Sequence, residues 1–191
     1  MDIRDRILAA ATRVYAETGF RGATTRRIAA EAGVNEITLF RHFGSKAALI
    51  SEAVVAERGG VVVAALPETP VDPEAELLAW ARGHLEVLRA KRALIRTCMG
   101  DFEEHPEMLP PCGSPTARAA DALALYVGRL RAAGLARGDG DPRVAAALLI
   151  GALFADAMGR DIMSDLYRSS PEEAVREYVR LFLRGIGVEV A

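Results

Sequence analysis

The amino-acid sequence predicts an all-α protein, and three observations support this prediction. Apolar residues recur every three or four positions through most of the 191 residues, which is the spacing of a buried helix face. Four of the apolar segments begin with an Asp–Pro or Ser–Pro pair, as expected for a helix N-cap followed by a first-turn proline. Only Val61–Val63 favours a strand, and the sequence offers no second strand to pair with it.

The N-terminal region is predicted to begin with one long helix and to end with another, the fourth helix of the chain. Apolar residues repeat at helical spacing over Asp2–Thr18, and Gly19 ends this first helix. A fourth helix begins over Ser45–Val54. It ends at the glycine pair 59–60 or continues through the three valines to Leu66. We expect it to continue, because a strand there would have no partner.

Two short helices joined by a tight turn lie between these two. Thr24 can cap the first short helix, and Gly33 stands where a helix end favours a left-handed residue. Asn35 can cap the second short helix, in which Leu39 and Phe43 point inward. Polar, cationic and aromatic residues cover its other faces. This layout is typical of a DNA-reading helix-turn-helix.

The rest of the chain predicts five more helices, which makes about nine in all. They follow a linker at 67–71, and their approximate ranges are 72–88, 92–103, 114–134, 142–163 and 171–185. The last one starts with a capping box at Ser170–Glu173. The helix at 142–163 consists almost entirely of small and apolar residues, so we expect other parts of the protein to cover it on all sides.

Charge is distributed unevenly along the chain. Residues 1–50 hold eight Lys/Arg and five Asp/Glu, whereas the remainder holds 16 and 21, so net charges of +3 and −5 give the total of −2. A basic N-terminal region is expected where only that end meets phosphate. We expect no membrane span and no signal peptide. Two cysteines, Cys98 and Cys112, form no disulfide framework and fit packing roles in a cytoplasmic protein.

The N-terminal pattern resembles the TetR/AcrR family of transcriptional regulators over about residues 3–55. The matching residues are Gly19, Phe20, Thr24, Thr25, Ile28, Ala29, Ala32, Gly33, Val34, Thr38, Leu39, Phe40, His42, Phe43, Ser45, Lys46 and Leu49. The resemblance implies a helix-turn-helix DNA-binding domain at 1–50 and a ligand-binding and dimerisation domain at 51–191. It also implies a homodimer on a palindromic operator in double-stranded DNA, usually a repressor, that a small molecule releases.

The resemblance also implies two sets of DNA-binding residues. The positions that typically meet phosphate are Thr25, Arg26, Phe40, His42 and Lys46. The positions on or beside the base-reading surface are Asn35, Glu36, Ile37, Thr38 and Arg41. Three of these depart from the family. Phe40 replaces a common tyrosine, Ile37 replaces a small residue, and Glu36 is an acid that suits only a donor such as a cytosine amino group.

The resemblance places the dimer surface on the last two helices, at about 142–163 and 171–185, and the effector site among the helices spanning 74–160. Ala and Gly in the last pair of helices permit close approach of a partner. Candidate effector-lining residues are Trp80, His84, Leu88, Arg96, Cys98, Met99, Phe102, Tyr126, Phe154 and Met158. They favour an apolar or aromatic ligand with one polar group, and each also suits an ordinary core position. We expect no cofactor and no metal.

Two other functions have weaker support. An enzyme or a metal- or thiol-responsive regulator would draw on His84, Cys98, Asp101, Glu103, Glu104, His105 and Cys112. None of these residues has the spacing of a zinc motif, and the sequence has no phosphate loop, nucleophile elbow or cofactor fingerprint. A helical interaction protein that has lost DNA binding is favoured only by Glu36 and the low basicity.

Overall fold

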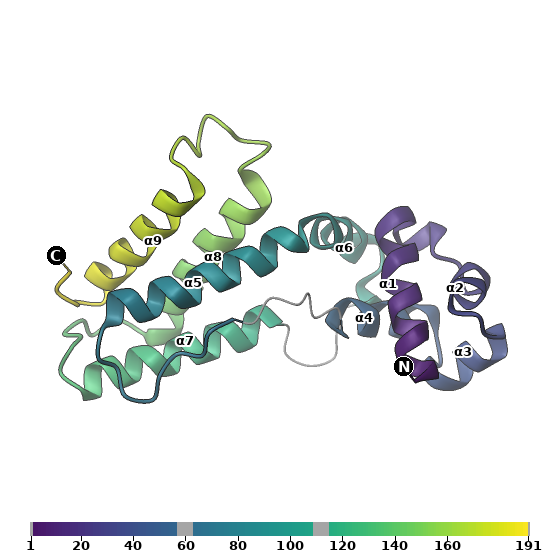
Figure 1. Ribbon diagram of the computed structural model, residues 1–191, viewed down its shortest axis with the longest axis horizontal. Helices are drawn as coiled ribbons and strands as arrows, with labels where there is room; N and C mark the ends of the chain where they lie inside the picture. The colour runs from purple at the N-terminus through teal and green to yellow at the C-terminus, as the bar shows by residue number, and fades with distance from the viewer. Residues whose placement is uncertain (1, 57–62, 109–114, 191) are drawn as a thin grey trace. The chain divides into compact units, whose positions relative to one another are not determined.

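The computed structural model describes residues 2–56, 63–108 and 115–190, and these form helices joined by turns (Figure 1). The described residues contain no strand, so the all-α prediction is confirmed. The chain divides into two compact units. Unit 1 draws on Met1–Gly59 and Lys91–Ser114, and unit 2 draws on Gly60–Ala90 and Pro115–Ala191.

Unit 1 is built around its first helix. Its elements are α1 (Ile3–Gly22), α2 (Thr25–Ala32), α3 (Glu36–Phe43), α4 (Lys46–Ala56), α6 (Arg92–Glu104) and the 3-10 turn η1 (Pro106–Met108). Helix α1 packs against α2, α4 and α6 (Figure 1). The fully buried side chains include the predicted core residues Ile7, Tyr15, Ile28, Leu39 and Leu49. Thus α6, far along the chain, joins the N-terminal helices in one core.

Local signals set the helix ends of unit 1 as predicted. Gly19 interrupts α1 with a φ of +64°, and one further short turn follows it. The Thr24 hydroxyl accepts a hydrogen bond from the backbone N–H of Arg27. Gly33 ends α2 in the left-handed conformation, with a φ of +65°, and the Asn35 side chain caps α3. These two residues set the turn between α2 and α3.

Unit 2 contains the four remaining helices. They are α5 (Pro73–Ala90), α7 (Pro115–Ala132), α8 (Pro142–Gly159) and α9 (Pro171–Gly185). Helix α8 packs against the other three, and α5 also packs against α9 (Figure 1). Leu77, Leu123, Leu130 and Val179 are fully buried between them. The predicted capping box is present at the start of α9, where the Ser170 hydroxyl and the Glu173 carboxylate each accept a backbone N–H.

A buried carboxylate ties three helices of unit 2 together. Asp156 on α8 is fully buried. It accepts hydrogen bonds from Arg89 on α5 and from Tyr178 on α9, each at 3.0 Å, and from Arg160, which directly follows α8. Burial raises the pKa of Asp156, but the hydrogen bonds from the two arginines and the tyrosine outweigh it, so the pKa lies below its usual value. The ionised carboxylate therefore holds α5, α8 and α9 in register.

Two predicted helix ends were wrong. Helix α8 ends at Gly159 rather than Met163, because the Arg160 side chain folds back onto Asp156 and also reaches the Ser169 carbonyl oxygen. Those bonds hold the following residues in turns. The predicted continuation of the fourth helix to Leu66 fails as well. Residues 63–66 are not helical, and residues 57–62 lie outside the described part of the chain.

Tertiary contacts explain why residues 63–66 are neither helix nor strand. Arg129 on α7 donates hydrogen bonds to the carbonyl oxygens of Leu66 and Pro67, at 3.4 and 3.0 Å. Val63 passes so close to α5 that a Cβ atom on Gly83 would lie 3.3 Å from the Val63 Cα. A side chain therefore satisfies backbone groups that a helix or a paired strand would otherwise satisfy.

Candidate nucleic-acid interface

The outer face of α3 carries exposed side chains of the predicted DNA-binding region. Leu39 and Phe43 of this helix point into the unit 1 core. Ile37 is 75% exposed and Phe40 is 45% exposed, although both are large and apolar. Arg41 and His42 are exposed as well. Helix α3 therefore presents a short surface that combines apolar contact with positive charge, as base edges and phosphates require.

Thr25 and Glu36 lie together at the start of the two short helices. The Thr25 hydroxyl donates a hydrogen bond to the Glu36 carboxylate, which links the first residue of α2 to the first residue of α3. Both side chains are half-buried. The acid therefore has a partner within the protein, and a DNA base is not its only available donor. The sequence assigned these residues to two different sets, and gave no sign that they are neighbours.

Asn35 and Thr38 occupy the N-terminal turn of α3. The Asn35 side-chain oxygen accepts the backbone N–H of Ile37 at 3.1 Å, so this residue caps the helix. The backbone N–H of Thr38 donates to the Asn35 carbonyl oxygen. The N-terminal turn of α3, which is the positive end of its dipole, carries the exposed side chain of Ile37. Such a helix end favours a nearby phosphate.

Lys46 is held inside unit 1. Its ammonium group donates a hydrogen bond to the Phe20 carbonyl oxygen at 2.6 Å and lies 4.0 Å from the centre of the Phe20 ring. Burial lowers the pKa of Lys46, and the nearby Asp101 carboxylate opposes that change only in part. A contact between this lysine and phosphate would replace the bond to Phe20. Its role at DNA stays a prediction.

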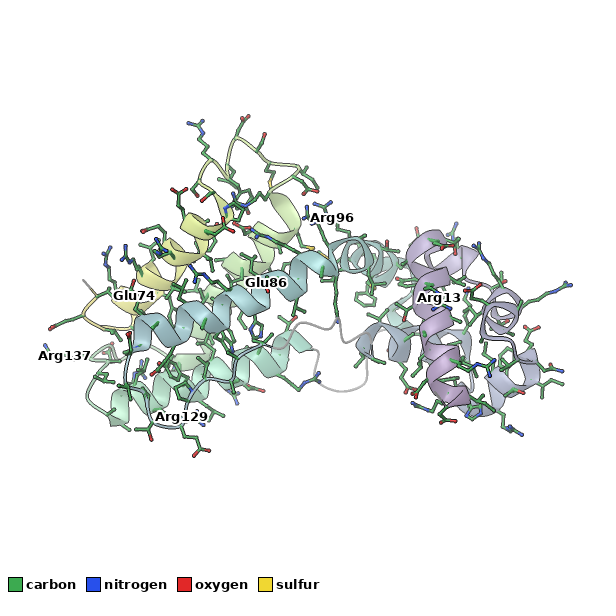
Figure 2. The ribbon with its side chains drawn as sticks, viewed as in Figure 1. Arg13, Glu74, Glu86, Arg96, Arg129 and Arg137 are labelled. Carbon is green, nitrogen blue, oxygen red and sulfur yellow. The ribbon has the colours of Figure 1, made fainter. Side chains whose placement is uncertain are left out.

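Most arginines of the N-terminal region brace the helices. Arg4 pairs with Glu52, Arg13 pairs with Glu31 at 3.0 Å, and Arg27 pairs with Glu17 at 3.0 Å. Arg6 donates to the carbonyl oxygen of Ala32 at 2.6 Å, beside the turn. Figure 2 shows Arg13 on α1. Arg26 and Arg27 are both exposed residues of α2, and Arg27 is the one that pairs with Glu17. Glu17 and Glu31 are already counted in the excess of +3, whereas Glu52 lies outside residues 1–50, so its pair with Arg4 lowers the charge available to DNA.

The candidate effector residues fall into both units. Arg96, Cys98, Met99 and Phe102 lie on α6 of unit 1, where Cys98 is buried and Phe102 packs against the core. Burial raises the pKa of the Cys98 thiol, which makes it a poor nucleophile. Among the described residues, no group of three or more His, Cys, Asp or Glu could hold a metal ion. Cys112 lies outside the described residues.

The other six candidates belong to unit 2, and two of them line a cavity of about 410 Å³. These two are Trp80 and His84 of α5. The Tyr126 hydroxyl donates to Glu76. Leu88, Phe154 and Met158 are half-buried. Residues that the sequence analysis did not select line the remainder of the cavity, chiefly Arg118 and Arg129 of α7 and residues 63–66. A tertiary contact, the bond between Arg129 and Leu66, brings them together.

The short exposed helix that follows a glycine turn defines a helix-turn-helix DNA-binding protein, and known proteins agree with this class. Residues 7–53 match the family described as bacterial regulatory proteins, tetR family. The chain is 25% identical over 185 residues to the HTH-type transcriptional regulator YvkB of Bacillus subtilis. That alignment covers 96% of this chain and 97% of YvkB.

Solved structures extend the likeness to both units. A protein from Mesorhizobium loti that is described as a TetR-family transcriptional regulator is 26% identical, with a TM-score of 0.77 and 97% of each chain covered. The flavonoid-responsive regulator FrrA is 25% identical, with a TM-score of 0.68 and 95% of each chain covered. Residues 7–53 are therefore a DNA-binding domain of the TetR type, and the chain as a whole is similar to TetR-family transcriptional regulators, which are not enzymes.

Proposed function

We propose that this chain acts in the cytoplasm as a homodimeric repressor, which binds a palindromic operator and leaves it when a small molecule binds unit 2. The observation that carries the proposal is an apolar surface on α8 and α9. Leu148 of α8 is 70% exposed and Leu181 of α9 is 62% exposed. They line a groove of about 290 Å³ together with Ala145, Ala152 and Gly185. Small residues beside exposed leucines suit close packing of a second copy.

The composition of α8 supports the same reading. By length and composition alone it is apolar enough to cross a membrane, yet only a third of it is buried within the described part of the chain. Core helices of soluble proteins pass the same test, so the finding is weak evidence for a membrane. A second copy of α8 and α9 would cover apolar surface of α8 that this chain leaves unburied. Two recognition helices would then be available for a palindromic site.

Within the dimer we assign the DNA contacts to unit 1. Thr25, Arg26, Phe40, His42 and Lys46 would hold phosphates, and the N-terminal part of α3 with Arg41 would read bases. The exposure of Phe40, Arg41 and His42 supports these roles. Residues 1–50 form the DNA-binding domain in this proposal, and residues 51–191 bind the effector and the partner. Helix α6 would then belong to the second domain in function, although it packs against α1.

Release by a small molecule is supported by the cavity in unit 2 and by one relative. FrrA is described as flavonoid-responsive, which suggests an aromatic effector for this chain as well. The cavity in unit 2 has a volume of about 410 Å³, which suits a small organic molecule. A coupling free energy of about 1–3 kcal/mol between effector and operator would reduce DNA affinity by roughly 5- to 150-fold.

A variant of the apolar surface tests the proposal. Replacing Leu148 and Leu181 by Asp should place two carboxylates in each half of the dimer surface and produce monomers in size-exclusion chromatography with light scattering. The monomer should also lose its sequence-specific gel shift on the DNA upstream of its own gene. Val71→Asp is the matched control, since Val71 is 82% exposed in the segment before α5. A wild-type protein that is monomeric at micromolar concentration, or that binds all DNA sequences alike, would contradict the proposal.

A further inference from the structure

The cavity of unit 2 is lined by groups from three segments. Helix α5 contributes Trp80 and His84, helix α7 contributes Arg118 and Arg129, and Leu66 belongs to the segment before α5. Ala119, Ala122 and Leu125 complete the side formed by α7. No acidic residue is among the described residues that line it. Within the described part of the chain, the lining therefore combines apolar side chains with the two arginines.

Arg129 keeps its charge in this position. Its hydrogen bonds go to the carbonyl oxygens of Leu66 and Pro67, which are neutral acceptors. These bonds fix the guanidinium group beside the segment that precedes α5. Arg129 projects from α7 in Figure 2. A guanidinium that donates to carbonyls retains its full positive charge and further N–H donors. Because the group is already held in place, a carboxylate could bind it with little loss of side-chain entropy.

Trp80 and His84 form the aromatic side of the cavity. Their ring centres lie 3.9 Å apart, and the planes are tilted by 36°. Trp80 is buried, whereas His84 is half-buried and covers it. Burial lowers the pKa of His84, and the contact of Nδ1 with the Trp80 carbonyl oxygen opposes that change only in part. The imidazole is therefore neutral at pH 7, and it offers a flat surface rather than a second cation.

We propose that this cavity binds a planar aromatic carboxylate, whose ring stacks on His84 and whose acid group pairs with Arg129. The inference rests on the proposed effector response and adds to it the chemical class of the effector. A neutral aromatic molecule would leave the arginine without an anionic partner. A linear fatty acid would leave the paired rings without a stacking partner. The aromatic ring and the anion together distinguish this class from both.

Trp80 allows a direct test, because it is the single tryptophan of the chain. We expect 2-naphthoate, added to the full-length protein at pH 7.5, to change the Trp80 emission in a saturable manner. Calorimetric titration should give the same dissociation constant. The neutral isostere 2-naphthamide and the linear acid decanoate should each bind at least about tenfold more weakly, since each lacks one of the two interactions.

Variants of two arginines sharpen the test. Arg129→Gln should weaken 2-naphthoate at least about tenfold and leave 2-naphthamide unchanged, whereas Arg129→Lys should retain most of the affinity. Arg137→Gln is the matched control, because Arg137 is exposed and lies outside the cavity (Figure 2). Thermal melting of each variant establishes that it is folded.

Each result either supports the inference or overturns it. Equal binding of the acid and the amide, equal binding of decanoate, or an unchanged affinity in Arg129→Gln would overturn it. So would the absence of 2-naphthoate binding in a protein that still shifts its operator DNA, and the regulator function would then stand. If the protein instead binds 2-naphthoate selectively but recognises no specific DNA, the ligand site stands and the proposed repressor function fails.

Discussion

Units 1 and 2 place their charged and apolar side chains in contrasting ways. Unit 1 keeps its ion pairs at the surface, as in Arg13–Glu31, and its large exposed apolar side chains include Ile37 and Phe40 on the face of α3. Unit 2 buries its central carboxylate, Asp156, and leaves Leu148 and Leu181 in solvent. The contrast shows which surface of each unit is free to bind a partner. The exposed face of α3 in unit 1 suits DNA, and the exposed leucines of unit 2 suit another helical surface.

The largest effect is expected from the buried carboxylate. Asp156→Asn removes the charge that faces Arg89 and Arg160, so these arginines lose their anionic partner in the interior. We expect the free energy of unfolding to fall by about 3–5 kcal/mol, measured by urea denaturation. Glu31→Gln is the surface control. Its pair with Arg13 is about half-exposed and should contribute no more than about 1 kcal/mol. Similar losses in the two variants would remove the contrast between the units.

The second prediction concerns how the stabilising contribution of Asp156 depends on pH. Because the folded-state pKa of Asp156 lies below its unfolded value, its stabilising contribution is complete above the unfolded pKa, which is about 4. It is lost as the pH falls through the lowered folded pKa. The stability difference between wild type and Asp156→Asn should therefore be constant from about pH 5 to 8 and shrink below about pH 4. A difference that is independent of pH down to 2 would show that another feature of the site stabilises unit 2.

The smallest effect is expected at Lys46. This variant tests whether the ammonium group of Lys46 is available to phosphate. If its ammonium group leaves the Phe20 carbonyl oxygen for phosphate, Lys46→Ala should weaken all DNA sequences alike, on the order of tenfold at low salt. The slope of affinity against salt concentration should fall by about one. Thr38→Ala is the contrasting variant, and it should change the preference between sequences. An unchanged salt slope with lowered stability would mean that Lys46 only braces the fold.

Most of the fold could be predicted because its signals are local. Helix caps, a left-handed glycine and the spacing of apolar residues act within a few positions, so α1, α2, α3 and α9 appear where the sequence predicts them. The failures occurred where distant groups decide. Residues 63–66 are neither helix nor strand, and Arg129, more than sixty positions away, donates to the carbonyl oxygen of Leu66. Helix α8 stops early because Arg160 turns toward Asp156.

The candidate site shows the same division. The sequence identified the short exposed helix and the family, and both rest on residues within one contiguous stretch. It could not indicate that Thr25 and Glu36 bond to each other, or that Lys46 lies under the Phe20 carbonyl oxygen. It also could not indicate which arginines are held by acids of neighbouring helices, as Arg13 is by Glu31. Pairing between helices has no signature in residue spacing.

The sequence by itself determined the all-α class, the helix-turn-helix and the family, because capping, periodicity and turn chemistry are written within a few neighbouring residues. Only the tertiary structure decided which charged side chains pair between helices and which candidate effector residues share a cavity. It also decided that α6 packs with the N-terminal helices. These outcomes depend on contacts between residues far apart in the chain. The free energy of such a contact belongs to the pair, and neither residue reveals it alone.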